Sequence, residues 1–161
     1  MNEVNEVKYW LLKSEPTTFS WDHLWKSPKR TTRWDGVRSF QARNYLRDDM
    51  QVGDLAFFYH SSADPTAIVG IAEIVKAGYP DATAFDPSDE HYDPKSKRDA
   101  PQWYSVDIRA KQPATKPITL ADLRQQKGLA HMVLLQKGSR LSVQPVSEAE
   151  WKLIYRLAFA G

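Results

Sequence analysis

Five of the six residues from Leu55 to His60 are apolar, and this run constrains the fold more than any other segment. A strand without polar alternation is typical of a position that is covered by side chains on both faces of a sheet. A second strand is predicted over 67–77, where β-branched residues are frequent and Gly70 indicates a bend or a bulge. The chain therefore needs apolar layers on both sides of a central strand.

Three further strands are predicted from alternation and from turn residues at their ends. In the strand predicted over 8–14, alternation puts Trp10, Leu12 and Ser14 on one face. The others cover 103–110 and the shorter segment 140–144.

Four short helices are predicted from their N-terminal capping residues. The second of these helices covers 40–49, and the four caps, in chain order, are Ser20, Ser39, Thr119 and Ser147. Because strands and helices do not alternate as βαβ units, the pattern favours an α+β fold: a small pseudo-β-barrel of five to six strands with short flanking helices at its ends.

A polar segment between Tyr79 and Pro101 holds four of the ten prolines and many charges. We expect it to form a long loop. Loops of this length in compact domains are often functional.

The length of 161 residues fits a single domain, and no apolar stretch approaches the roughly 20 residues of a membrane helix. The first residues lack the basic start and apolar run of a signal peptide, so we expect a cytoplasmic protein, or a nuclear one that enters by diffusion or with a partner. The net charge is only +2, so binding of nucleic acid would require a local basic patch.

The sequence does not have the motifs of an enzyme. The four histidines form no H-x-x-x-H or H-E-x-x-H pair, no Gly-rich phosphate loop is present, and the absence of cysteine excludes thiol nucleophiles and zinc sites built on Cys. Acid–base catalysis could use Glu15, Asp35 and His60 if the three converged, but each has a simpler structural interpretation. We predict a protein that is not an enzyme.

Aromatic residues are unusually frequent, with six Trp, seven Tyr and six Phe. Such rings form cores, but exposed rings also stack on nucleobases. We assign the following five to the core: Trp10, Phe57, Phe58, Trp103 and Trp151.

The sequence Trp34-Asp35-Gly36 predicts a surface turn that presents a large ring just before a helix. The free N–H groups at the start of that helix attract a phosphate or an acceptor on a base. Arg38 and Arg43 lie close enough in sequence to meet a phosphate backbone.

An ordered series of motifs resembles the EVE domain family over about residues 8 to 157. The motifs are 9–16 (YWLLKSEP), 34–38 (WDGVR), 50–54 leading into 58–61 (FYHS), 69–73 (VGIAE), 79–81 (YPD), 92–95 (YDPK), 103–107 (WYSVD), 117–120 (PITL) and 140–145 (RLSVQP). Two residues depart from the expected pattern: Ser39 stands where Asn is expected, and Phe40 replaces the commoner Tyr. These departures bear on base preference, whereas Ser still caps a helix and Phe still stacks.

The resemblance implies a PUA-like pseudo-barrel, related to the YTH readers of methylated adenine. It also implies a non-catalytic reader that needs no cofactor and no metal. The expected ligand is a modified nucleobase such as 5-methylcytosine, in DNA or RNA, flipped out of the strand into an aromatic pocket.

The resemblance further implies a set of site residues. Trp34 would stack on the base, Tyr59 would form a second wall, and Gly36 would let the backbone approach the base. The complete expected pocket is Ser14, Trp34, Asp35, Gly36, Val37, Tyr59, His60 and Ser61, and the expected phosphate contacts are Lys13, Arg38 and Arg43.

Two alternatives stay open at this point. The protein could be a sensor of free modified nucleosides, which needs no phosphate contacts, or an enzyme that acts on the modified base.

Overall fold

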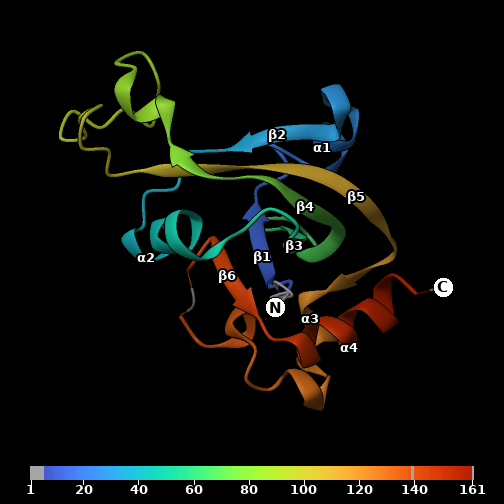
Figure 1. Ribbon diagram of the computed structural model, residues 1–161. Coiled ribbons are helices and arrows are strands. Elements are labelled where there is room, and N and C mark those ends of the chain that lie inside the picture. Colours follow the sequence, from blue (N-terminus) through green and yellow to red (C-terminus); the bar gives the residue numbers. More distant parts are fainter. Residues whose placement is uncertain (1–5, 139, 161) are drawn as a thin grey trace, which may run out of the picture.

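The computed structural model describes residues 6–138 and 140–160, and these residues contain one six-stranded mixed sheet (Figure 1). The strand order is β2-β5-β4-β3-β1-β6, in which only the β1–β3 pair is parallel. The strands are β1 (Tyr9–Ser14), β2 (Thr31–Trp34), β3 (Leu55–His60), β4 (Ala67–Pro80), β5 (Tyr104–Thr119) and β6 (Val143–Val146).

Short helices flank the sheet, as the sequence predicted. The α-helices are α1 (Trp21–Lys26), α2 (Phe40–Asn44), α3 (Leu120–Arg124) and α4 (Glu148–Ala158). The second continues as a π-helical turn, η2 (Tyr45–Asp49), and four 3-10 turns are η1 (Pro28–Arg30), η3 (Ala82–Phe85), η4 (Lys127–Leu129) and η5 (Val133–Leu135). All four predicted caps are confirmed, because each side chain accepts a hydrogen bond from a backbone N–H in the first turn: Ser20, Ser39, Thr119 and Ser147.

The central strand β3 lies between two apolar clusters, which confirms the interpretation of its sequence. Phe58 and Ala56 belong to the cluster that contains Trp34 and Leu12. Phe57 and Tyr59 belong to the cluster on the opposite face, which α3 and α4 cover. The five rings assigned to the core are all buried.

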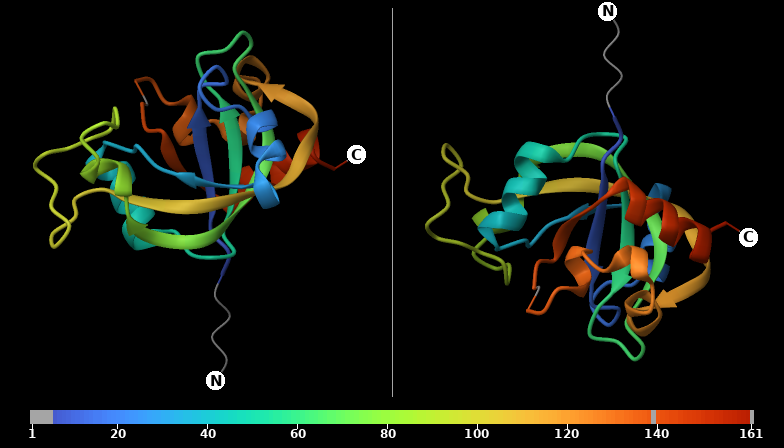
Figure 2. Two further views of the ribbon diagram at one scale, coloured as in Figure 1. Left: turned by 90° about the horizontal axis from the view of Figure 1, so that it is seen from above. Right: turned by 90° about the horizontal axis from the view of Figure 1, so that it is seen from below.

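The sheet curls strongly because β4 and β5 are long and irregular. Figures 1 and 2 show β5 sweeping from the loop near α2 around to α3. Register shifts interrupt the β4–β5 ladder, and one of them lies between Ile68 and Gly70. A Cβ at Gly70 would lie 2.5 Å from the Trp21 ring, so glycine lets α1 pack against the bend. The result is the α+β pseudo-barrel that the sequence predicted.

One strand was missed, and three boundaries differ from the sequence-based expectation. The strand β2 was not predicted, and β5 extends to Thr119, past the predicted end at residue 110 and through two prolines. The last strand runs over Val143–Val146 rather than 140–144, since a sheet edge tolerates Pro145. The long loop begins at Asp81 because β4 continues to Pro80.

No helix in the described part of the chain is both long enough and apolar enough to cross a membrane.

Candidate functional site

A cavity of about 510 Å³ lies at the C-terminal ends of β1 and β2. It is lined by the end of β1 and the turn that follows, by β2 and the turn that follows, by the long loop after β4, and by Ser142 just before β6. Its lining residues are Lys13, Ser14, Glu15, Thr18, Phe19, Thr32, Arg33, Trp34, Asp35, Val37, Glu90, His91 and Ser142.

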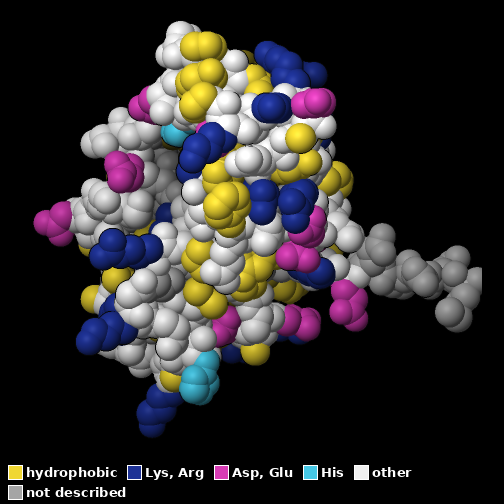
Figure 3. Space-filling model, turned by 90° about the vertical axis from the view of Figure 1, so that its left-hand side faces the viewer, with side chains coloured by type: hydrophobic (Ala, Val, Ile, Leu, Met, Phe, Trp, Pro, Cys, Tyr) yellow, Lys and Arg dark blue, Asp and Glu magenta, His cyan; other side chains and the backbone are white. Residues whose placement is uncertain are grey.

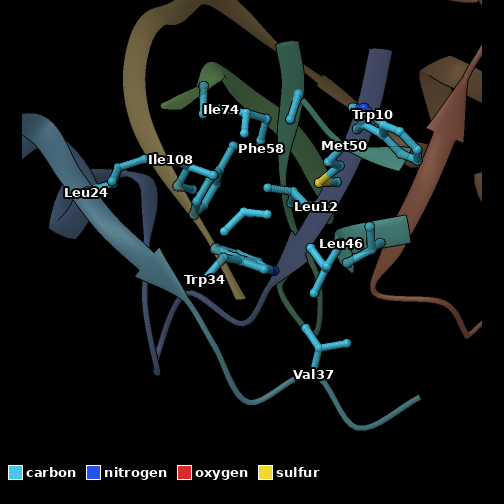
Figure 4. Packing of buried hydrophobic residues seen from close by; sticks show 14 of the residues in the cluster. Trp10, Leu12, Leu24, Trp34, Val37, Leu46, Met50, Phe58, Ile74 and Ile108 are labelled. Atoms are coloured by element: carbon cyan, nitrogen blue, oxygen red, sulfur yellow. The ribbon is translucent and has the colours of Figure 1, made fainter. Parts of the chain in front are cut away.

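Trp34 forms the apolar floor of the cavity. Its ring meets the Phe58 ring edge-on, with 5.8 Å between centroids and an interplanar angle of 80°. Figure 4 shows Trp34 and Val37 toward one end of the apolar cluster that also holds Phe58 and Leu12. Trp34 is only 9% exposed, so the expectation that this ring sits on a surface turn is wrong.

Ser14 lies at the end of β1 and fixes the turn that follows. Its hydroxyl donates to the carbonyl oxygen of Phe19, and its own carbonyl accepts from the N–H of Ser61 at 2.9 Å. The Ser14 hydroxyl oxygen can still accept a hydrogen bond from a ligand. The half-buried Phe19 lines the cavity beside it and supplies a second aromatic surface.

Asp35 is the half-buried carboxyl group next to the floor. Burial raises its pKa, and the negative charges of Asp81 and Asp89 act in the same direction, whereas Arg33 and His91 oppose them. No other residue in 6–138 or 140–160 donates a hydrogen bond to this carboxylate. Its oxygens are therefore available as acceptors inside the cavity.

The loop after β4 is attached to the turn after β2 through a buried carboxylate. Asp81 accepts from the Gly36 N–H at 2.8 Å and from Arg38 at 3.0 Å through one oxygen. Its other oxygen accepts from the N–H and the hydroxyl of Thr83, at 2.9 and 2.6 Å. Arg38 also donates to the His91 carbonyl oxygen at 2.7 Å. One arginine of the turn after β2 therefore binds two points of the long loop, Asp81 and His91.

His91 approaches the backbone of Gly36 so closely that no side chain fits between them. A Cβ at Gly36 would lie 2.6 Å from the imidazole, and Gly36 has a φ of +76°, which glycine adopts without strain. The imidazole has acidic neighbours in Asp89, 3.2 Å away, and Glu90, 3.8 Å away. The predicted long loop thus contributes a ring to the cavity.

Four of the eight expected pocket residues line this cavity, namely Ser14, Trp34, Asp35 and Val37. Tyr59 does not form a second wall, because alternation along β3 directs it into the cluster on the opposite face of the sheet. His60 accepts a hydrogen bond from the Trp21 N–H at 3.0 Å, and burial lowers its pKa. Gly36 and Ser61 act through their backbones, outside the lining.

Of the three expected phosphate contacts, one lines the cavity and two are bound to other parts of the fold. Lys13 lines the cavity, and burial lowers its pKa. The guanidinium of Arg38 is held by Asp81, Thr83 and the His91 carbonyl oxygen. Arg43 donates to the Gln102 carbonyl oxygen at 2.7 Å. Both arginines therefore stabilise the loop around the cavity.

Several lining residues were missed by the sequence analysis, chiefly Phe19, Arg33 and His91. Phe19 was interpreted only as part of a helix start, and Arg33 lies in the strand that was not predicted. His91 lies in the segment that was expected to be functional, but nothing in its local sequence singled it out.

Figure 3 shows basic and acidic side chains interspersed on one face, with apolar side chains between them. Within the described ranges, no group of three or more His, Asp or Glu side chains is placed to hold a metal ion.

The chain is similar to known proteins over nearly all of its length. The family model of the EVE domain matches residues 8–157. Thymocyte nuclear protein 1 of Homo sapiens is 41% identical over 170 residues, which cover 95% of this chain and 75% of that protein.

Solved structures show the same similarity. A protein of Pseudomonas syringae is 46% identical, with a TM-score of 0.87 over 92% of this chain and 98% of that chain. Human THYN1 protein, in a crystal structure with DNA that contains 5-methylcytosine, is 41% identical, with a TM-score of 0.88 over 93% of this chain and 96% of that chain. From its fold and from these matches, the chain belongs to the EVE domain family.

Proposed function

We propose that this protein is a non-catalytic reader that binds one modified base of the 5-methylcytosine type, turned out of a DNA strand into the cavity of Trp34. The observation that carries the proposal is a cavity large enough for one base, with an aromatic floor and acceptor oxygens at its side. The DNA complex of human THYN1, 41% identical to this chain, supports the same class of ligand.

Each group in the cavity has a role that follows from its chemistry. The base lies against Trp34 and Phe19, because flat rings stack on aromatic side chains. Val37 adds apolar surface for a methyl group. The carboxylate of Asp35 accepts a hydrogen bond from the exocyclic amino group of cytosine, which is the pairing that acidic side chains make with this base.

The structure separates the three acid–base candidates that the sequence offered. Glu15 and Asp35 line the cavity, but His60 does not, and its Nε2 is already occupied by the Trp21 N–H. Glu15, Asp35 and His60 are therefore not gathered around one ligand, and the histidine that lines the cavity is His91.

We expect a modest preference for 5-methylcytosine over cytosine. Burial of one methyl group is worth about 0.8 kcal/mol, which is roughly a fourfold difference in Kd. Titration of two single-stranded oligonucleotides that differ only in this methyl group, at one salt concentration, measures the ratio. A preference of about a thousandfold would exclude an apolar slot as its source, and equal affinities would exclude the reader function.

We expect a larger preference for 5-methylcytosine over thymine, which carries the same methyl group but an oxygen in place of the amino group. That oxygen would face the Asp35 carboxylate, so the difference should be about 1–3 kcal/mol, or roughly 5- to 150-fold in Kd. Asp35→Asn should remove most of this selectivity, because an amide serves either base. Selectivity retained in Asp35→Asn would assign the recognition to another group.

The same selectivity should depend on pH. Burial raises the pKa of Asp35 above its ordinary value, so this carboxylate becomes protonated earlier than an exposed one as pH falls. Selectivity for 5-methylcytosine over thymine should therefore be complete at neutral pH and decline as pH falls through that raised pKa. Titrations at several pH values should give a flat profile for Asp35→Asn.

The salt dependence of binding distinguishes a reader of nucleic acid from a sensor of free nucleosides. A strand releases counterions as its phosphates are bound, so log Kd should change linearly with log salt concentration. A free nucleoside has no phosphate and therefore no condensed counterions to release, so its Kd should depend little on salt. Comparing the nucleoside with the oligonucleotide decides between these two functions.

A further inference from the structure

A segment that carries four cations borders the cavity. Residues 26–33 hold two lysines and two arginines and no acidic residue, in a chain whose net charge is only +2. The segment comprises the end of α1, the turn η1 and most of β2. We propose that residues 26–33 bind the phosphates of the strand on one side of the bound base. This inference rests on the proposed function.

The segment starts at the cavity itself. Thr32 and Arg33 belong to the lining, next to Trp34 on the floor. A base in the cavity stays linked through its sugar to the rest of the strand, so its phosphates leave past the rim. Since β2 is an edge strand of the sheet that the described residues form, no further strand of that sheet covers its outer side, and at about 3.3 Å per residue it leads about 7 Å from Arg33 back to Thr31, which follows Arg30.

Three of the four cations of this segment are available to a ligand, unlike the two arginines expected from the sequence. Within residues 6–138 and 140–160, the side chains of Lys29, Arg30 and Arg33 make no hydrogen bond or ion pair. Arg38 and Arg43, in contrast, donate to groups of the long loop. Phosphates are therefore expected to meet the β2 side of the cavity.

Arg30 is held in position before any ligand arrives. Its guanidinium carbon lies 3.6 Å above the ring centroid of Trp25, which packs against the core. A guanidinium stacked on a ring keeps the N–H groups at its rim free to donate to phosphate. Because the side chain is already ordered, less conformational entropy is lost on binding.

The turn that carries these cations is fixed by its backbone. Lys29 and Arg30 have φ values of 56° and 55°, in the left-handed region. The Arg30 N–H donates to the Ser27 carbonyl oxygen at 2.8 Å, and the Thr31 hydroxyl donates to the Lys29 carbonyl oxygen at 2.9 Å. Lys26 contributes less, since it pairs with Asp22 at 3.0 Å.

The test compares the salt dependence of binding in matched charge variants. The probe is a single-stranded DNA oligonucleotide with one 5-methylcytosine, together with its unmethylated counterpart. The test variant is Lys29→Asn/Arg33→Gln, in which Asn suits the left-handed backbone at position 29. The control Lys116→Gln/Lys127→Gln removes the same charge from exposed residues at the α3 end of the molecule (Figure 1).

We expect the slope of log K against log salt to fall by about 0.7 per lost contact in the test variant, roughly 1.4 in all, and to stay near wild type in the control. Both oligonucleotides should lose affinity by the same factor, because phosphate contacts carry no base information. Replacing the flanking phosphate by an uncharged methylphosphonate should weaken the wild type and leave the test variant unaffected.

An unchanged slope in the test variant would overturn the proposal, as would an equal loss in the control. If the slope falls only in the variant Lys95→Gln/Lys97→Gln, the phosphates bind to the long loop, and the proposal is overturned as well. Failure of the proposed function has a different signature, namely equal affinity of the wild type for the two oligonucleotides, whatever the slopes.

Discussion

Trp34→Ala should lower the free energy of unfolding by about 3–5 kcal/mol and also remove binding of the modified oligonucleotide. The ring is buried against Phe58 within the cluster under the sheet, and truncation of such a residue leaves a cavity in the core. Its outer surface is the floor on which a base would stack, and the lost stacking is worth about 1–3 kcal/mol of binding. Denaturant unfolding and a titration of the folded variant measure the two losses separately.

A matched control separates the loss of stability from the loss of the site. Trp151 is equally buried but belongs to the cluster on the opposite face, where it stacks on Phe57 with 3.8 Å between ring centroids. Trp151→Ala should destabilise the fold to a similar extent and leave the affinity of the folded protein unchanged. Trp34→Phe, which retains a ring, should bind between the wild type and Trp34→Ala. Normal affinity in folded Trp34→Ala would exclude this ring as the base platform.

The position of Trp34 shows which part of the fold the sequence could predict. Helix caps such as Ser20 and Ser147 are local signals, because the cap and the N–H groups that it binds are within three residues of each other. The burial of Trp34 depends instead on pairing with Val106, 72 residues later (106 − 34). A four-residue strand has too short a pattern to reveal such a partner, so Trp34-Asp35-Gly36 was interpreted as a surface turn.

Arg38 and Arg43 show that local sequence also could not predict which side chains of the site are free to bind a ligand. Arg38 and Arg43 are close to Trp34 in sequence, which made them candidates for phosphate contacts. Their partners come from the loop after β4: Asp81 is 43 residues from Arg38, and Gln102 is 59 residues from Arg43. Charge patterns show where a cation lies along the chain, but not whether the fold already neutralises it.

Asp81→Ala should be the second change with a large effect, because one buried carboxylate holds the loop side of the cavity. The Asp81 side chain is fully buried and accepts from Gly36, Arg38 and Thr83. Removing one partner of a buried ion pair costs about 3–5 kcal/mol. We expect the lower end of that range, since 24% of the Arg38 side chain is exposed to solvent. Asp86→Ala, in an exposed turn of the same loop, is the matched control and should have little effect.

The pH dependence of stability tests the same carboxylate without a mutation. Burial alone would raise the pKa of Asp81, but hydrogen bonds from Thr83, Gly36 and Arg38 outweigh it and hold the pKa below its ordinary value. The stabilisation is therefore present above the unfolded pKa of about 3.9 and is lost as pH falls through the lower pKa of the folded state. The free energy of unfolding should decline more steeply below about pH 4 in the wild type than in Asp81→Ala.

A double-mutant cycle should show that Asp81 and Arg38 act as one unit. Once Asp81 is gone, Arg38 loses its ion pair and keeps the hydrogen bond to the His91 carbonyl oxygen. Adding Arg38→Gln to Asp81→Ala should therefore cost less than Arg38→Gln alone, with an interaction free energy of about 0.5–3 kcal/mol. In binding assays, both single variants should weaken methylated and unmethylated oligonucleotides alike, because they loosen the wall that carries His91 rather than a contact with the methyl group. Additive stabilities would show that the pair does not connect the loop to the turn, and a selective loss for the methylated strand would place Asp81 or Arg38 at the base itself.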